Sequence, residues 1–200
     1  MYKWRKLSQE EREDIVQYRK LRKVPWHAPP HWNYTGRKQF LITATCYEHA
    51  PVIGFSSARM ADFEMRLLEA CQKVGAKVYS WCVLPNHYHI LVLTDSIDEL
   101  RSELGLLLGR TSFEWNGEED TRGRKVWFRS LERPMKSERH FWTTMNYVHN
   151  NPVKHGYVKR WQDWPYSSAR QFIEEVGRDE AIRIWEEYPL LDYGKKWDHD

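Results

Sequence analysis

The stretch Trp81–Leu93, WCVLPNHYHILVL, constrains the fold of this chain more than any other. Valine, isoleucine and leucine crowd both sides of it, which favours a buried strand, and the Pro85–Asn86 pair indicates a bend or bulge. Residues two apart on a strand point to the same face, so His87 and His89 project together while Tyr88 projects the other way. Two neighbouring imidazoles are suited to holding one divalent ion, and the alternative is a solvent-facing pair at a strand end.

A second cluster, NYVHNNPVKHG at Asn146–Gly156, follows later in the chain. The segment before it has apolar residues at helical spacings, and Ser137 is typical of a helix start. Pro152 predicts that the helix stops at Asn151, because proline disfavours helical geometry in the residue before it. Tyr147 and Asn151 are four residues apart and share a face if the helix reaches Asn151. A tyrosine hydroxyl and a carboxamide beside two histidines suffice for metal-assisted attack of tyrosine on a phosphodiester.

The motifs PNHYH, YVHNNPVKHGYV and WQDWPYSSA resemble, in order and spacing, those of the single-tyrosine HUH transposases. Within that group the chain is most similar to the REP-associated tyrosine transposases, over roughly residues 36–172. The resemblance implies a transposase or strand transferase that cleaves and rejoins single-stranded hairpin (palindromic) DNA. Tyr147 would form a covalent 5′-phosphotyrosine intermediate, and His87, His89 and Asn151 would bind Mg²⁺ or Mn²⁺.

The third metal ligand is where the sequence departs from this pattern. Single-tyrosine relatives often carry glutamine four residues after the tyrosine, whereas this chain has the shorter Asn151. His149 and Asn150 are alternatives, although they lie further round the helix. Tyr88 is the rival nucleophile, but it points away from the histidines and is expected in the core. Cys82 is an odd number of residues from His87, so a regular strand would place it on the opposite face, also in the core, unless a bulge at Pro85 changes the parity.

Alternation and helical periodicity predict an α+β fold with a ferredoxin-like or RRM-like βαββαβ core, an added tyrosine-bearing helix, and N- and C-terminal extensions. The expected strands are 40–46, 77–84, 87–94 and 126–131; the expected helices are 57–74, 96–115, 137–151 and 170–188. Strands 77–84 and 87–94 form either a hairpin or one interrupted strand. We expect a basic arm with a Pro/Trp linker at 1–35, the catalytic domain at 36–156, and a C-terminal extension packed on the core at 157–200.

Positive charge is concentrated at the N-terminus. The net charge is +3, yet residues 1–40 hold ten Lys and Arg against four Asp and Glu, which favours a polyanionic partner. The alternative is an ordinary solvated helix capped by Ser8. The predicted DNA contacts are all cationic or imidazole side chains: Arg37, Lys38, Arg110, Arg122, Arg124, Lys125 and His155. For residues 122–125 the alternative is a charged turn on the surface.

Composition limits the remaining possibilities. The mean hydropathy is −0.79 and 30% of residues are charged. The sequence has neither a run long enough to span a bilayer nor a signal-peptide pattern, so we expect a cytoplasmic, nucleoid-associated protein that does not bind membranes. Three cysteines without close spacing support neither a disulfide framework nor a zinc ribbon. Monomer and homodimer both stay open.

Two other functions fit parts of the pattern. A replication-initiator-type nickase would share the HUH site, but the HNNPVKHG and WPYSSA segments argue against it. A catalytically inactive RRM-like nucleic-acid-binding regulator would share the fold, but such proteins display aromatic residues on the sheet where this chain has two histidines. The presence of both histidines and the tyrosine favours an active enzyme.

Overall fold

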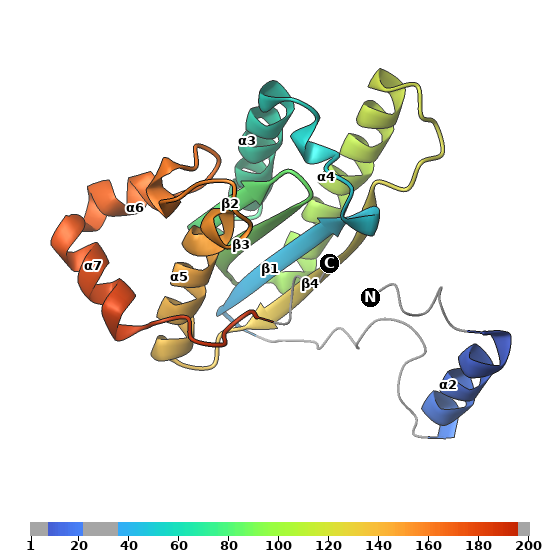
Figure 1. Ribbon diagram of the computed structural model, residues 1–200, viewed down its shortest axis with the longest axis horizontal. Coiled ribbons are helices and arrows are strands. Elements are labelled where there is room, and N and C mark those ends of the chain that lie inside the picture. The colour runs from blue at the N-terminus through green and yellow to red at the C-terminus, as the bar shows by residue number, and fades with distance from the viewer. Residues whose placement is uncertain (1–7, 22–35, 196–200) are drawn as a thin grey trace. The chain divides into compact units, whose positions relative to one another are not determined.

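The structure is a computed structural model that describes residues 8–21 and 36–195. Four antiparallel strands form one sheet in the order β2-β3-β1-β4 (Figure 1). The sheet and its helices follow the order β1 (Lys38–Cys46), α3 (Ser57–Lys73), β2 (Lys77–Leu84), β3 (His87–Thr94), α4 (Ile97–Glu118), β4 (Trp127–Pro134) and α5 (Glu138–Lys154). This is the predicted βαββαβ core with an added helix, so the α+β fold is confirmed.

The Pro85–Asn86 pair is a hairpin turn, which settles the pairing that the sequence left open. Leu84 lies opposite His87, and Cys82 lies opposite His89. Directly opposed residues of an antiparallel pair share a face, so Cys82 is on the histidine face and the expectation that it faces the other side was wrong. An odd offset separates the faces of two residues only on one continuous strand, whereas here the chain reverses between Cys82 and His87. Cys82 is nevertheless fully buried in the core, as expected.

The two faces of the sheet are covered by different helices. Tyr88 packs against Phe63 of α3, with ring centroids 5.6 Å apart, and Phe63 packs in turn against Trp115 of α4 at 5.7 Å. On the other face, α5 lies along β2 and β3, and Val148 joins a buried cluster with Leu41 of β1. Strand alternation therefore sends Tyr88 into the α3–α4 side and both histidines toward α5.

Helix α5 continues past the predicted stop. It runs to Lys154 with Pro152 inside it, so the expectation that it ends at Asn151 was wrong. Proline removes one backbone donor, but the last turn is closed by the amide of His155, which donates to the Asn151 carbonyl at 3.1 Å. Asn151 and Pro152 are both buried, and this packing outweighs the local preference of the residue before proline.

The segment after α5 returns to the sheet and then forms two helices (Figure 1). Ser167 forms an isolated bridge with Cys82, which ties the segment to the outer strand β2. The single helix expected over 170–188 is instead α6 (Ala169–Val176) and α7 (Arg178–Glu187). Gly177 separates them with φ 85°, a left-handed conformation that glycine adopts without strain.

The chain divides into two compact units, 1–34 and 35–200. Within the first, α2 (Gln9–Leu21) begins at Ser8, whose hydroxyl accepts from the Glu11 amide at 3.2 Å while the Glu11 carboxylate accepts from the Ser8 amide. This reciprocal pair confirms Ser8 as the cap. The Pro/Trp linker expected up to residue 35 lies outside the described residues. Among the helices that are described, none is long and apolar enough to cross a membrane.

Candidate active site

His87 and His89 lie side by side on the face of β3 that α5 covers. Their ring centroids are 5.0 Å apart, and each side chain is 1% exposed. A buried polar ring costs free energy unless its nitrogens find partners. The partner of each ring nitrogen therefore indicates which nitrogen is fixed by a hydrogen bond and which can bind a cation or contact a substrate.

Hydrogen bonds on the Nδ1 side hold both rings in place. His87 Nδ1 lies 2.7 Å from Asn86 Oδ1, and the Asn86 amide nitrogen donates to the His49 carbonyl, which fixes Oδ1 as the acceptor. His89 Nδ1 lies 2.6 Å from the hydroxyl of Thr43, its cross-strand partner. Such contacts orient imidazoles and leave Nε2 of each ring as the functional atom.

Tyr147 and Asn151 meet those two Nε2 atoms from α5. Tyr147 Oη is 3.5 Å from His89 Nε2, and Asn151 Oδ1 is 3.0 Å from His87 Nε2. The helix runs through both residues, so the premise that they lie one turn apart on one face is confirmed. All four side chains belong to one chain and are at most 1% exposed.

The atoms at this point fit a bound cation. With its proton on Nδ1, His87 presents a lone pair at Nε2 to the lone pairs of Asn151 Oδ1, an arrangement that a positive charge would stabilise. The buried Asn151 Nδ2 has no hydrogen-bond partner in the described part of the chain. Among the described residues there is no cluster of three His, Cys, Asp or Glu side chains. The donor set is instead two imidazoles and one amide oxygen, which is too few for a closed four-ligand zinc site and would leave positions on a divalent cation for phosphate oxygens.

The C-terminal segment encloses the tyrosine. The Tyr193 ring lies 5.7 Å from the Tyr147 ring, and its hydroxyl contacts Thr144 at 2.5 Å and His140 at 2.9 Å. A Cβ on Gly194 would fall 2.2 Å from Tyr147 Cε2, so only glycine permits this approach. Lys154 lies over the Tyr147 ring at 5.2 Å and donates to the Gly194 carbonyl at 3.1 Å.

The rival residues lie elsewhere. Tyr88 is fully buried on the opposite face, and burial raises the pKa of its hydroxyl far above the usual range, so it is core as expected. His149 stacks on Trp161 at 5.6 Å and shares a hydrogen bond with Ser168, and burial lowers its pKa to about 3. His149 is therefore not a ligand of this site.

The predicted DNA-contacting residues divide between the two ends of the sheet. The 122–125 loop lies at the histidine end, because Tyr47, directly after β1, donates to the Val126 carbonyl. Arg37 and Lys38 lie at the other end of β1, where Lys38 pairs with Thr94. Arg110 is exposed on α4, and the His155 ring is 5.0 Å from the His87 ring, which places His155 beside the site.

Several of the basic side chains already have protein partners, and Arg37, for example, lies 3.8 Å from the Asp95 carboxylate. Arg124 forms two hydrogen bonds with Glu119, at 2.8 and 3.0 Å, and this pairing lowers the pKa of the Glu119 carboxyl to about 2. Arg122 donates to the Phe113 carbonyl at 2.7 Å. A role for them in phosphate binding stays a prediction, and for Arg124 it competes with the ion pair.

Sequence reasoning did not identify Thr43, Asn86, Lys154 or Tyr193 as site residues. Asn86 adjoins His87 in the PNHYH motif, so its neighbourhood was a usable signal. Thr43 reaches His89 only through the β1–β3 register, and Tyr193 reaches Tyr147 only through tertiary packing. Neither relation leaves a local mark in the sequence.

Two known proteins share sequence similarity with part of this chain. No protein-family model matches it. It is 26% identical over 139 residues to a Haemophilus influenzae protein described as "Putative REP-associated tyrosine transposase", covering 62% of this chain and 79% of that protein. It is 31% identical over 103 residues to the REP-associated tyrosine transposase of Escherichia coli K12, covering 51% of this chain and 58% of that protein, which is less than two thirds of it. Over these segments the chain is similar in sequence to REP-associated tyrosine transposases.

A solved structure of a REP-associated tyrosine transposase bound to a REP hairpin has the same fold. Its TM-score with this chain is 0.58 at 18% identity, over 72% of this chain and 84% of that one. The resemblance read from the three motifs is thus confirmed by sequence relatives, and the transposase fold by a structural relative.

Proposed function

We propose that this chain is a DNA strand transferase that cleaves and rejoins hairpin-bearing single-stranded DNA through a phosphotyrosine intermediate at Tyr147. The observation that carries the proposal is the meeting of Tyr147 Oη with His89 Nε2 at 3.5 Å, beside the His87–Asn151 pair at 3.0 Å. A hydroxyl nucleophile beside nitrogen and oxygen atoms that can bind a cation is an arrangement suited to metal-assisted cleavage of a phosphodiester. The chain's sequence similarity to transposases that act on DNA supports the same assignment.

In the proposed reaction, Tyr147 Oη attacks the scissile phosphorus. The new O–P bond links Tyr147 to the 5′ phosphate of the downstream fragment, and the bond from phosphorus to the 3′ oxygen breaks, which leaves the upstream fragment with a free 3′-hydroxyl. The tyrosine proton passes to solvent, and the departing 3′ oxygen takes up a proton from solvent. Attack by a different 3′-hydroxyl on the phosphotyrosine reverses these steps and joins new strands without ATP.

The remaining residues hold and shield the centre. Thr43 and Asn86 keep the imidazole rings turned toward α5, so the reacting atoms need little reorganisation. His87, His89 and Asn151 would hold Mg²⁺ or Mn²⁺. When bound, the cation would neutralise charge on a non-bridging phosphate oxygen and orient the phosphate. Because Tyr147 is 1% exposed beneath Tyr193 and Gly194, DNA entry requires the C-terminal segment to move.

Histidine variants test this proposal. His87→Ala and His89→Ala should each lower metal-dependent cleavage of a hairpin oligonucleotide by on the order of 10³-fold, because each removes a group next to the reacting atoms. Hairpin affinity, measured by gel shift, should change little, since other side chains are predicted to make the phosphate and stacking contacts. A parallel loss of binding and cleavage would show that the histidines read DNA or support the fold. Binding without cleavage by the wild-type protein would favour the RRM-like regulator instead.

A further inference from the structure

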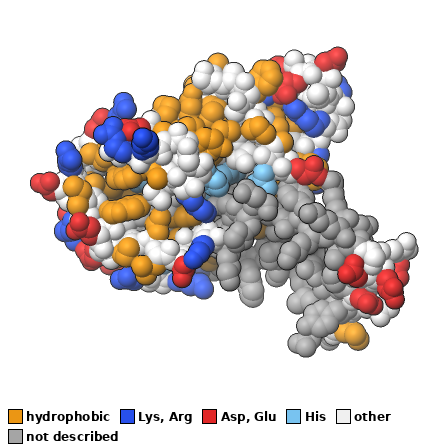
Figure 2. Space-filling view, in the orientation of Figure 1, with side chains coloured by type: hydrophobic (Ala, Val, Ile, Leu, Met, Phe, Trp, Pro, Cys, Tyr) orange, Lys and Arg blue, Asp and Glu red, His pale blue; other side chains and the backbone are white. Residues whose placement is uncertain are grey.

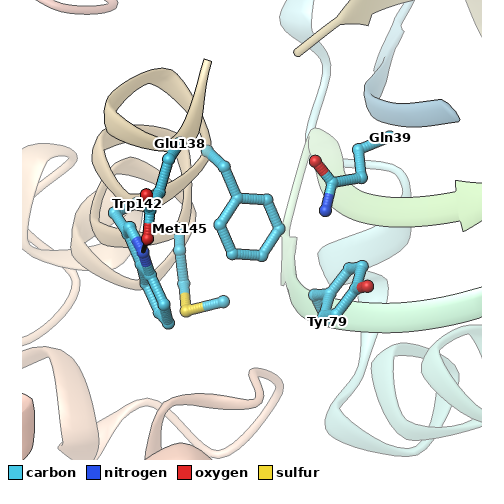
Figure 3. A pocket seen from close by; sticks show the side chains of 6 residues that line it. Gln39, Tyr79, Glu138, Trp142 and Met145 are labelled. Atoms are coloured by element: carbon cyan, nitrogen blue, oxygen red, sulfur yellow. Dashed lines mark hydrogen bonds between the residues drawn. The ribbon is translucent and has the colours of Figure 1, made fainter. Parts of the chain in front are cut away.

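A pocket lies at the other end of α5, away from the two histidines. Its volume is about 460 Å³, and Gln39, Tyr79, Glu138, Phe141, Trp142 and Met145 line it. Figure 3 shows Glu138, Trp142 and Met145 on the helix side, facing Gln39 and Tyr79 on the strands. The pocket opens on the same face of the sheet as the histidines, because Gln39 has the same parity on β1 as Thr43, which faces His89.

A β-bulge turns Tyr79 toward this pocket. The β2–β3 register shifts between Val78 and Ser80, so Tyr79 is the extra residue of the bulge. Its ring meets Phe141 edge to face, with centroids 5.0 Å apart. Phe141 and Met145 are buried and form the floor, whereas Tyr79 and Trp142 are only partly buried and form walls. The pocket therefore offers exposed aromatic surface to a flat ligand.

Two polar groups stand over this aromatic surface. Gln39 makes no side-chain hydrogen bond among the described residues, so its amide can both donate and accept. Within residues 8–21 and 36–195, the Glu138 carboxylate accepts only one long contact, from Trp142 Nε1 at 3.5 Å. An amide with a carboxylate matches the edge of a nucleobase, where donors and acceptors alternate, and a carboxylate accepts well from an exocyclic amino group.

The charges around the pocket favour the same orientation of a nucleotide. Glu138 would repel a phosphate placed inside, whereas Lys77, Lys136 and Arg139 are exposed at the ends of the elements that form it. Lys77 Nζ already lies 5.0 Å from the Tyr79 ring. Figure 2 shows hydrophobic side chains on the α6–α7 side of the molecule interspersed with charges of both signs, rather than one basic field. A base would enter, and its phosphates would stay at the rim.

We propose that this pocket binds one unpaired nucleobase of the DNA substrate, and that the base carries an exocyclic amino group. The inference rests on the proposed function. Tyr147 follows Phe141 by six positions on the helix, which corresponds to a rise of about 9 Å. A short unpaired segment can therefore occupy the pocket while its scissile phosphate lies at Tyr147. The pocket then sets which unpaired sequence is cut, whereas the histidine site carries out the reaction.

The test uses the full chain and a hairpin oligonucleotide with an unpaired flank, each flank position being replaced in turn by an abasic site. For the wild-type protein, one position should lose about tenfold in affinity by fluorescence anisotropy, the effect of one stacked base. Trp142→Ala should bind the intact DNA about tenfold more weakly and become insensitive to the abasic change there. Glu138→Gln should keep stacking but lose the preference for adenine, cytosine or guanine over thymine at that position.

Matched variants separate the outcomes. Phe55→Ala removes an aromatic side chain that is 63% exposed and should retain every wild-type response. Trp142→Phe keeps a ring and should restore sensitivity, which excludes loss of fold as the cause. A hairpin that binds with no sensitive position, or a sensitive position unchanged in Trp142→Ala and Glu138→Gln, would overturn the pocket alone. Absence of any hairpin binding by the wild-type protein would overturn both this inference and the proposed function.

Discussion

Both faces of the sheet bury aromatic side chains, but their buried polar groups have different partners. On the α3–α4 face, the rings of Tyr88, Phe63 and Trp115 pack together, and the buried Arg59 of α3 is neutralised by ion pairs with Glu118 and Glu119. On the α5 face, His87, His89 and Asn151 are equally buried. Buried polar groups cost about 1–3 kcal/mol each when they lack partners, so two imidazoles and an amide that meet at one point of the α5 face are better explained by chemistry than by stability.

The largest expected effect comes from the nucleophile. Tyr147→Phe removes one oxygen and should lower formation of covalent protein–DNA product by at least about 10³-fold. Binding of hairpin DNA and the melting temperature should stay near wild type, because the ring and its contact with Tyr193 persist. Denaturing gels with labelled oligonucleotide measure the product. Residual adduct at the wild-type rate would remove Tyr147 from the mechanism.

The next effect concerns the amide beside His87. Asn151→Ala should raise the Mn²⁺ concentration needed for half-maximal cleavage by about 10- to 100-fold, the usual cost of weakening a metal's surroundings. Saturating Mn²⁺ should restore part of the rate, since water can replace a neutral oxygen ligand. A metal titration in parallel with wild type provides the measurement. An unchanged metal requirement would exclude Asn151 as a ligand and leave the tyrosine assignment intact.

A third prediction separates a structural histidine from the site histidines. Burial lowers the pKa of His149 to about 3, whereas an unfolded chain titrates near 6.5. Between those values the unfolded state binds the extra proton, so this residue reduces stability by up to about 1.4 kcal/mol per pH unit as pH falls. His149→Gln should therefore show a shallower loss of stability below pH 6.5 in urea unfolding. Equal slopes for both proteins would contradict the buried neutral state.

The smallest effect belongs to the opposite face. The Tyr88 hydroxyl is buried and makes no hydrogen bond with any described residue. Tyr88→Phe should thus leave stability unchanged or raise it by up to about 1 kcal/mol, and cleavage should not change. Thermal unfolding and the cleavage assay together check this. A large loss of activity would mean that the two faces are not as independent as their packing indicates.

Sequence patterns predicted most of the fold because they report local alternation. The PNHYH motif placed His87 and His89 on one face, and the spacing of Tyr147 and Asn151 placed those two on one helical face, as the structure has them. Local rules failed where distant contacts decide. Helix α5 continues through Pro152 because the packing of buried residues outweighs the local preference of proline. Cys82 lies on the same face as the histidines because the chain reverses between β2 and β3.

The parts of the candidate site that escaped prediction depend on register and docking. Thr43 faces His89 because β1 and β3 pair in one particular register, and Tyr193 covers Tyr147 because the C-terminal segment returns across α5. The pocket at Tyr79 depends on a bulge of one residue. None of these relations has a periodicity that a single sequence could display.

The most direct test of the account is to identify the residue that becomes linked to DNA. Wild-type protein would be incubated with Mn²⁺ and a hairpin oligonucleotide, digested with protease, and the nucleotide-bearing peptide sequenced by mass spectrometry. The account predicts a single adduct on Tyr147, with the nucleotide attached through its 5′ phosphate. An adduct on Tyr88, Tyr157 or Tyr193, or cleavage of the hairpin without any adduct, would contradict it.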